Sequence, residues 1–323
     1  KNEGIINLSI NGKSINLSDY ENRTDKIFSR NKIVFDIIAD QILVNKKIGI
    51  SGNLKGKLEN SIITSVAYGK MGLGETSLLD SGKFEIYVDN KVSKLSGIGL
   101  VGGAETKIEL IREKDKFPSI YFDTLDGGKL LDTLGFTKNL RSGEMQMTIN
   151  FLNDSYTHYK GAINSKNFSL KNAPGIINSL SVLSFAGIQS VIVGEGVFFQ
   201  KGKVNINVKN DLFVFDNLFL SSESLAIKGQ GELNLKKKTV DMIGTVAPVR
   251  LLSRVLSLVP AVGQLLTGIK KDGLLAGQFK MSGSIEKPEI NLNPMSFAPG
   301  ILRDIFAKDW LEDNNLLLQP NSN

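Results

Sequence analysis

The chain has no cysteine, and His158 is its single histidine among 323 residues. Without cysteine it can form neither a disulfide nor a thiolate metal site. One histidine cannot build a histidine-based metal cluster, although a site made of carboxylates alone stays open. We therefore predict a protein that carries no metal and no cofactor.

Positive and negative charges are mixed along most of the chain, with no dense basic patch. The 39 Lys and Arg residues are scattered among 33 Asp and Glu residues, which leaves a net charge of +6. A nucleic-acid-binding protein usually shows a dense basic patch or stripe. We therefore predict no nucleic-acid partner, while a mild attraction to an anionic membrane surface is compatible with the excess of lysine.

Catalytic motifs are also missing. His158 ends a polar run and is typical of an exposed loop or strand residue. The nearest paired carboxylates are Asp36 with Asp40 and Asp123 with Asp126, and neither pair lies in a recognisable hydrolase motif. Asp126 precedes two glycines and is more simply a turn residue or the N-cap of a helix. We predict no catalytic residue, and hence not an enzyme.

The chain lacks a long and strongly apolar run of the kind that crosses a membrane as a helix. Residues 172–194 carry no charge and are long enough, since about 20 residues span a bilayer. However, a proline and several Ser, Asn and Gln residues lower their apolarity. We predict a helix or helix pair near residues 173–192, buried or at a membrane interface, with a membrane-spanning helix as the less favoured alternative.

A second apolar helix is predicted over residues 249–266, and Pro260 would interrupt it. Arg250 and Arg254 lie one turn apart at its start, and either half is too short to span a bilayer. The helix is therefore a candidate membrane-facing element. Its membrane-facing residues would be Val255, Leu256, Leu258, Val259, Leu265 and Leu266.

Most of the remaining sequence alternates between apolar and polar residues, the pattern of half-buried β-strands. Ile6, Leu8 and Ile10 alternate in this way and are followed by Asn11-Gly12, a strong hairpin signal. Glycines lie within and between the later runs, where they often mark bulges or close approaches of backbone. We predict a mainly β fold: an elongated, twisted antiparallel sheet shaped as an open groove or half-barrel of β repeats, with a few apolar helices toward the C-terminus.

Composition shifts suggest three segments. A charge run that ends in a proline at residues 112–118 predicts a boundary there. Residues 1–117 would be a strand-repeat segment of the β groove. Residues 118–310 would form a C-terminal region with helices near 127–137, 173–192 and 249–266, and residues 311–323 a flexible tail.

The strands of the C-terminal region offer the best candidate for a functional surface. On an antiparallel sheet their alternating apolar side chains share one face. Such a face is either the core of an ordinary sandwich or the floor of a groove that receives acyl chains, and the pattern does not decide between the two. The candidate lipid-groove residues are Ile206, Val208, Phe213, Phe215, Leu225, Ile227, Val240, Met242 and Val246.

Short stretches rich in glycine and proline follow one another in a specific order over more than half the chain. They lie at residues 128–135, 140–145, 172–177, 194–199, 227–235, 244–248, 259–268, 279–288 and 293–296. In content and order they resemble the C-terminal region of the AsmA-like family, in its YhdP-type alphaproteobacterial branch. The first hundred residues resemble that family only in style, as degenerate strand repeats.

The resemblance implies a bridge-like phospholipid transporter of the Gram-negative cell envelope. Such proteins are periplasmic and anchored to the inner membrane by an N-terminal helix. Their apolar β groove would move phospholipid between the inner and outer membranes. Because the chain begins with Lys1 and not Met, we expect a fragment that lacks the anchor. The implied partners are phospholipid acyl chains, a membrane surface, and outer-membrane or periplasmic proteins.

A second function stays open beside lipid transport. The resemblance also implies an assembly or scaffold factor for outer-membrane protein biogenesis. A sheet edge that pairs with client strands would be its mechanism.

Overall fold

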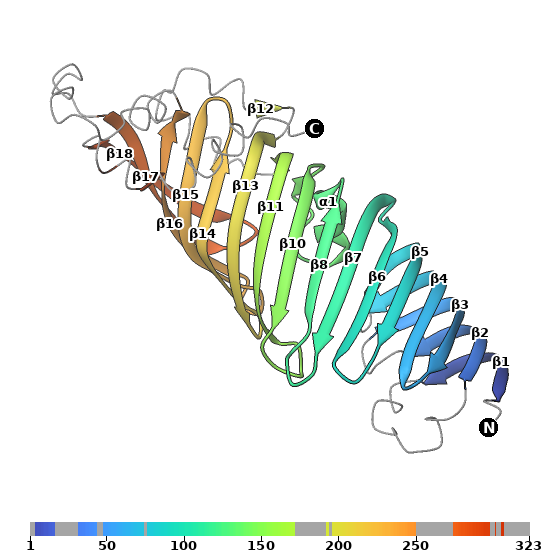
Figure 1. Ribbon diagram of the computed structural model, residues 1–323. Coiled ribbons are helices and arrows are strands. Elements are labelled where there is room, and N and C mark those ends of the chain that lie inside the picture. Colours follow the sequence, from blue (N-terminus) through green and yellow to red (C-terminus); the bar gives the residue numbers. More distant parts are fainter. Residues whose placement is uncertain are drawn as a thin grey trace, which may run out of the picture. The chain divides into compact units, whose positions relative to one another are not determined.

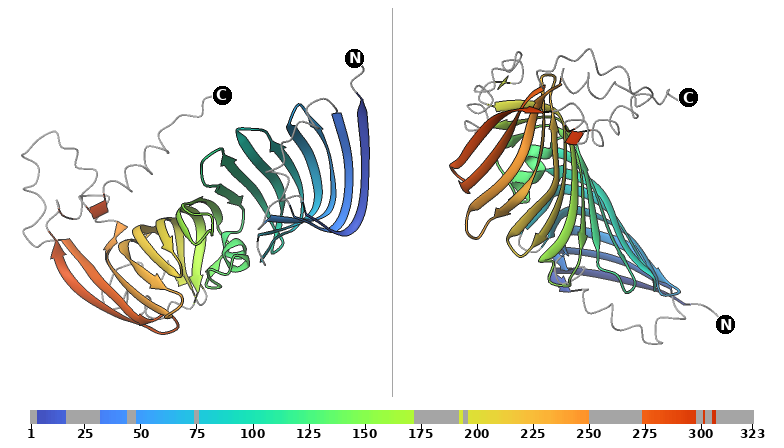
Figure 2. Two further views of the ribbon diagram at one scale, coloured as in Figure 1. Left: turned by 90° about the horizontal axis from the view of Figure 1, so that it is seen from below. Right: turned by 90° about the vertical axis from the view of Figure 1, so that its left-hand side faces the viewer.

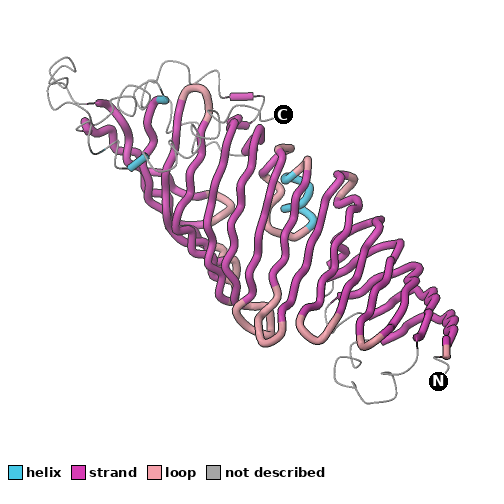
Figure 3. Tube along the Cα trace, in the orientation of Figure 1, coloured by secondary structure: helices cyan, strands magenta, loops and turns pink. Residues whose placement is uncertain are grey.

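The computed structural model describes residues 4–16, 32–43, 48–73, 76–171, 192–193, 196–249, 274–297, 301 and 305–306. Strands dominate these residues, and the fold is mostly β, as predicted (Figure 3). The chain divides into two compact units, Lys1–Tyr159 and Lys160–Asn323. Each unit is built on open, twisted β-sheet.

In the first unit, strands that follow one another in the sequence are neighbours in the sheet (Figure 1). All of these pairs are antiparallel except β1 with β2, which is parallel. β8 also pairs with β10, and the short helix α1 lies between them in the sequence. The elements are β1 (Ile5–Asn16), β2 (Lys32–Leu43), β3 (Ile48–Glu59), β4 (Ile62–Leu73), β5 (Thr76–Val88), β6 (Val92–Val101), β7 (Ala104–Glu113), β8 (Ser119–Thr124), α1 (Gly127–Thr133), β9 (Leu140–Arg141) and β10 (Glu144–Phe151).

The second unit repeats the antiparallel meander from β13 to β18. The two-residue strand β12 pairs with the start of β13. A bulge in β14 between Phe215 and Leu218 shifts its register against both β13 and β15. The elements are β11 (His158–Lys171), β12 (Ile192–Val193), β13 (Gly196–Lys209), β14 (Leu212–Ser221), β15 (Leu225–Asn234), β16 (Thr239–Pro248), β17 (Leu274–Ser284) and β18 (Pro288–Phe297).

Because of the cross-strand register, one face of the first sheet is apolar and the other carries charged side chains. Side chains that are directly opposite on neighbouring strands share a face. One such row carries large apolar side chains that are almost fully buried, among them Leu54, Phe84 and Phe122. The other face carries cross-strand ion pairs, such as Lys55 Nζ with Asp36 Oδ2 at 2.9 Å. The core of this unit therefore lies along one face of a single sheet.

A row of glycines crosses four strands of the first sheet on its buried face. The register places Gly52, Gly69, Gly82 and Gly99 opposite one another on β3, β4, β5 and β6. Gly52 and Gly69 have φ of 138° and 147°, and a Cβ at Gly69 would overlap the carbonyl oxygen of Ser51. A side chain is excluded here because the two backbones approach so closely. The strands of each sheet are curved along their length (Figure 2), and in the first sheet this row permits the close approach.

Phenylalanine rings fill the space beside several other glycines. Phe84 lies directly opposite Gly97, and its ring atom Cδ1 is 2.5 Å from the position that a Gly97 Cβ would take. In the second unit Phe279 lies opposite Gly244 at the same separation. Each ring covers the bare backbone of the neighbouring strand, which buries apolar area that glycine cannot supply.

The helix predicted near residues 127–137 is α1, and it ends at Thr133. The hairpin predicted at Asn11-Gly12 is wrong, because β1 runs through both residues and pairs in parallel with β2. The charge run at 112–118 covers the end of β7 and its connection to the paired strand β8, so it lies inside the first unit. The helices predicted at 173–192 and 249–266 lie outside the described residues except for β12 and Val249, as does the predicted tail at 311–323.

Replacement of Gly69 by alanine should destabilise the protein. The Cβ would clash with the carbonyl of Ser51 in a backbone conformation that side chains rarely adopt. We expect the free energy of unfolding to fall by about 2 kcal/mol or more, measured by chemical denaturation followed by circular dichroism. Gly12→Ala is the matched control, because nothing lies within 4 Å of its Cβ position, and it should change stability by less than about 0.5 kcal/mol. Equal effects of the two changes would contradict the role of the glycine row.

Candidate functional site

The nine residues predicted to line a lipid groove lie on one face of the second sheet. Ile206 is opposite Phe215, Phe215 is opposite Gly231, and Gly231 is opposite Met242. A second row contains Val208, Phe213 and Val240, and a third pairs Ile227 with Val246. Leu225 precedes Ile227 by two residues on the same strand and therefore shares its face. We call this surface the apolar face.

The structure adds apolar residues to this face that the sequence pattern did not single out. The bulge in β14 shifts its alternation by one residue, so Leu218 joins Phe215 on the apolar face. Phe279, Met281 and Ile290 join it from β17 and β18 through pairing with Gly244 and Met242. The strands β17 and β18 also show apolar residues at alternate positions, and that signal could have identified the last three.

Burial divides the apolar face into two parts. Seven of the nine predicted residues are buried, from Leu225 at 0% exposed to Phe213 at 8%. Phe215 and Met242 are only half-buried. Together with four further half-buried residues of this face they form what we call the accessible band: Phe215, Leu218, Met242, Phe279, Met281 and Ile290.

The accessible band has no counterpart in the central row of the first sheet. There Leu54, Phe84, Ile108 and Phe122 are all exposed by 3% or less. The band also contains two methionines, whose flexible thioether side chains adapt to irregular apolar ligands. It is therefore the part of the apolar face that another molecule can reach.

The opposite face of the second sheet, the polar face, carries its own features. A small apolar cluster there contains Phe219 and Phe306 with three alanines. Beside it lies a cleft of about 680 Å³ whose described lining combines Lys, Gln, Asn and Thr residues with Ile243, Phe279 and Ile305. The cleft residues were not predicted, because they come together only through the register of β15 to β18.

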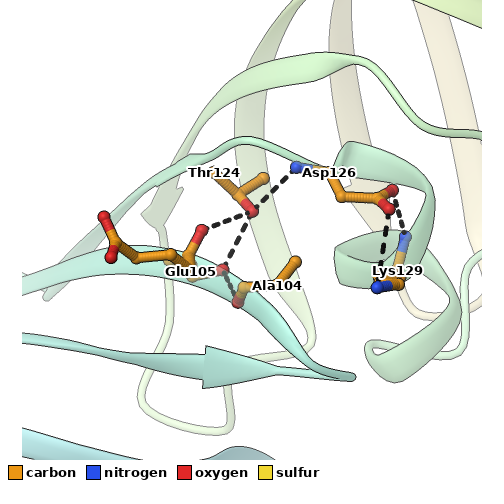
Figure 4. Close-up of polar contacts among 6 residues, drawn as sticks. Ala104, Glu105, Thr124, Asp126 and Lys129 are labelled. Atoms are coloured by element: carbon orange, nitrogen blue, oxygen red, sulfur yellow. Dashed lines mark hydrogen bonds and ion pairs between the residues drawn. The ribbon is translucent and has the colours of Figure 1, made fainter.

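The carboxylates considered for catalysis have structural roles where the structure describes them. The Asp126 Oδ1 accepts a hydrogen bond from the Lys129 N–H at 3.1 Å and caps α1, as predicted (Figure 4). Asp123 lies opposite Lys107 on β7, and Asp36 pairs with Lys55. None of these groups faces a second carboxylate in a shared cleft among the described residues.

Two buried threonines anchor the start of α1. The Thr106 hydroxyl donates to Thr124 Oγ1 at 2.9 Å, and the Thr124 hydroxyl donates to the Glu105 carbonyl at 3.1 Å (Figure 4). Thr124 Oγ1 also accepts from the Asp126 N–H at 3.3 Å. The hydroxyls are thus satisfied by each other and by backbone, which is the arrangement of a structural network.

His158 starts β11 and is held by its backbone. Its N–H donates to Asn153 Oδ1 at 3.1 Å, and its carbonyl accepts from the Leu152 N–H at 2.8 Å. Within the described ranges, no three His, Asp or Glu side chains are grouped so that they could bind a metal ion. In the same part of the chain no helix has the length and apolarity needed to cross a membrane. The predicted membrane-facing residues Val255, Leu256, Leu258, Val259, Leu265 and Leu266 lie outside it.

Comparison of the chain with protein-family models, with curated proteins and with solved structures gives no match. The interpretation of the site therefore depends on its own geometry. That geometry offers an apolar face with an accessible band on one side of the second sheet and a cleft of mixed polar and apolar lining on the other.

Most of the described ionisable groups whose pKa is shifted lie outside these two surfaces. Backbone N–H groups of Lys91 and Val92 donate to Asp89 at 2.7 Å each and lower the pKa of its carboxyl. Burial of the Tyr159 phenol raises its pKa from 10.0 to about 12. Its ring packs near Phe151, with the ring centroids 5.8 Å apart.

Tyr159 should ionise late and couple stability to alkaline pH. Its pKa is raised in the fold, so its contribution to stability is complete below pH 10.0 and is lost as the pH rises toward about 12. Tyr159→Phe should remove the part of the tyrosine absorbance titration near pH 12 and flatten the loss of stability over that range. Tyr68→Phe, in which an exposed ring is changed, should retain the late ionisation. A titration that Tyr159→Phe leaves unchanged would contradict the assignment.

Proposed function

We propose that the apolar face of the second unit binds phospholipid acyl chains, and that the protein is a non-enzymatic lipid carrier. The observation that carries this proposal is the accessible band beside the buried residues of the apolar face. By contrast, the central row of the first unit, which contains Leu54, Phe84 and Phe122, is almost fully buried. Half-buried Phe, Met, Leu and Ile side chains instead remain where an apolar ligand can cover them.

Acyl chains suit this surface because they need no specific polar contact. Each methylene removed from water contributes roughly 0.8 kcal/mol. The band crosses β14, β16, β17 and β18, so a chain lying over it contacts several strands in succession. Binding of this kind is tolerant of chain length and saturation, as lipid transport requires.

We further propose the wider role implied by the AsmA-like resemblance. In that role the chain is the C-terminal part of a bridge-like phospholipid transporter between the inner and outer membranes of a Gram-negative envelope, located in the periplasm. Support comes from the ordered glycine- and proline-rich stretches and from open sheets with one apolar face in each unit. The family assignment remains part of the proposal, since no family model matches the chain.

Charges placed in the accessible band should abolish acyl binding. In Met281→Lys/Ile290→Lys both altered side chains start half-buried on the apolar face, so the fold can accommodate them better than charges at the fully buried residues. We expect at least a tenfold loss of affinity for a fluorescent phospholipid, which corresponds to about 1.4 kcal/mol, and loss of co-purified lipid in native mass spectrometry.

The control for this experiment is Ile98→Lys, in which the side chain is 49% exposed on the polar face of the first unit. It should retain wild-type lipid binding. Circular dichroism of all variants establishes that they fold. Undiminished lipid binding by the folded Met281→Lys/Ile290→Lys variant would refute the acyl-binding proposal.

A second candidate function has its own supporting observation at β1. Among the described strands β1 pairs only with β2, and its apolar residues are unusually exposed, with Ile5 at 63% and Leu8 at 44%. Exposed edge strands readily add another strand, and Lys13 is the single charged residue of β1. The scaffold alternative would use this edge to hold a client strand.

Site-specific crosslinking separates the two functions, because a chain without cysteine accepts a single engineered thiol. A benzophenone attached through Met281→Cys should capture phospholipid acyl chains if the carrier proposal holds. The same probe attached through Leu8→Cys should capture a purified unfolded outer-membrane protein only if the scaffold alternative holds. Capture of the client at Leu8 with no lipid at Met281 would favour the scaffold over the carrier.

A further inference from the structure

Three hairpin tips of the second sheet lie side by side along one rim. The register across β13 to β17 forms a continuous row at this rim, which contains Lys209, Leu212, Asn234, Thr239 and Ser284. Backbone hydrogen bonds join the turns beyond it: the Leu235 N–H donates to the Asp211 carbonyl at 2.9 Å, and the Ile285 N–H donates to the Lys238 carbonyl at 3.0 Å. We call residues 209–211, 235–238 and 285–287 the basic rim.

Lysines from three separate stretches of the sequence meet on the basic rim. They are all exposed: Lys209, Lys236, Lys237, Lys238 and Lys287. The carboxylates of the rim are Asp211 and Glu286, and Glu286 Oε1 lies 3.4 Å from Lys238 Nζ. Five lysines less two carboxylates leave the rim a net charge of +3. The strands that carry the rim are described without a gap over residues 196–249 and 274–297.

The polar face behind the rim has the opposite sign. Glu232 lies opposite Asp241, and Ser282 links Asp241 in register to Glu289. All three carboxylates are exposed. Asp241 is two residues inside the rim row, roughly 7 Å along the strand, and the lysine side chains extend beyond the row. Salt screens charges over about 8 Å at physiological ionic strength, so an anionic surface is attracted to the tips and repelled by the polar face. It would therefore meet the sheet edge-on.

The basic rim also has apolar side chains at its tips. Leu235 is 36% exposed at the middle tip, and Ile285 is half-buried at the next. A concavity of about 390 Å³ lies between the first two tips, and its described lining includes lysines of both tips and Asp211. Lysines surrounding an exposed leucine suit a bilayer surface, where ammonium groups meet lipid phosphates and the apolar side chain enters the boundary of the acyl chains.

We propose that the basic rim docks the second unit edge-on to an anionic bilayer. A bilayer fits better than a nucleic acid, because only a bilayer offers Leu235 an apolar boundary to enter. Met281, in register with Ile290, lies three residues from the rim row, about 10 Å along the strand. Docking would therefore bring one end of the accessible band close to the lipid surface. This last step depends on the proposed acyl binding, whereas docking itself does not.

Sedimentation of the whole chain with vesicles tests the docking. Vesicles of phosphatidylglycerol mixed with phosphatidylcholine should bind the wild type, and pure phosphatidylcholine vesicles should bind it far more weakly. Lys236→Gln/Lys237→Gln should weaken binding to the anionic vesicles at least tenfold, because two ammonium groups then leave the contact. The matched control is Lys91→Gln/Lys114→Gln, which removes the same charge from exposed hairpin tips of the first unit and should leave binding unchanged.

Two further variants identify the occupant and separate docking from acyl binding. Leu235→Ser should weaken vesicle binding several-fold, since apolar area no longer enters the bilayer. Met281→Lys/Ile290→Lys should retain vesicle binding even where it abolishes acyl binding, so the two proposals can fail separately. Circular dichroism establishes that each variant folds.

Docking to an anionic bilayer is overturned if neutral and anionic vesicles bind the chain equally, or if the two lysine variants have equal effects. Leu235→Ser binding vesicles like the wild type would leave charge attraction alone and contradict the bilayer as partner. Duplex DNA that binds as tightly as the anionic vesicles would contradict it as well.

Discussion

The cross-strand register is the constraint on which both surfaces of this protein depend. Because side chains alternate along each strand, a slip of one residue would exchange the apolar and polar faces of that strand. Glycines help to hold the register: a Cβ at Gly69 would overlap the Ser51 carbonyl, and the Phe84 and Phe279 rings occupy space beside Gly97 and Gly244. A displaced strand would put side chains where only bare backbone fits.

The two units share this kind of register but differ in how completely the apolar face is buried. In the first, large side chains such as Phe84 and Phe122 bury the central row of the apolar face almost completely. In the second, Phe215, Met242 and Phe279 of the apolar face are only half-buried. Both faces contain glycines opposite large rings, Gly97 beside Phe84 and Gly244 beside Phe279, so the two units differ in burial although they share this packing device.

Sequence reasoning succeeded where the determining interactions are local. Alternation placed residues such as Ile206 and Phe215 on one face, and the Asp126 N-cap followed from its position before two glycines. It failed where partners are distant: Asn11-Gly12 signals a hairpin locally, but pairing with Gly12 opposite Ala39 keeps β1 extended. Leu218 was missed because a bulge shifts its face, and the cleft lysines because only the register of three strands brings Lys228 near Lys280.

The separation of chemistry between the two faces limits how lipid could engage the second unit. Acyl binding as proposed above would use one face only, because the hydrogen-bonded sheet separates the accessible band from the polar face. Apolar contact is non-directional and gives little selectivity, so the proposed site would accept chains of varied length and saturation.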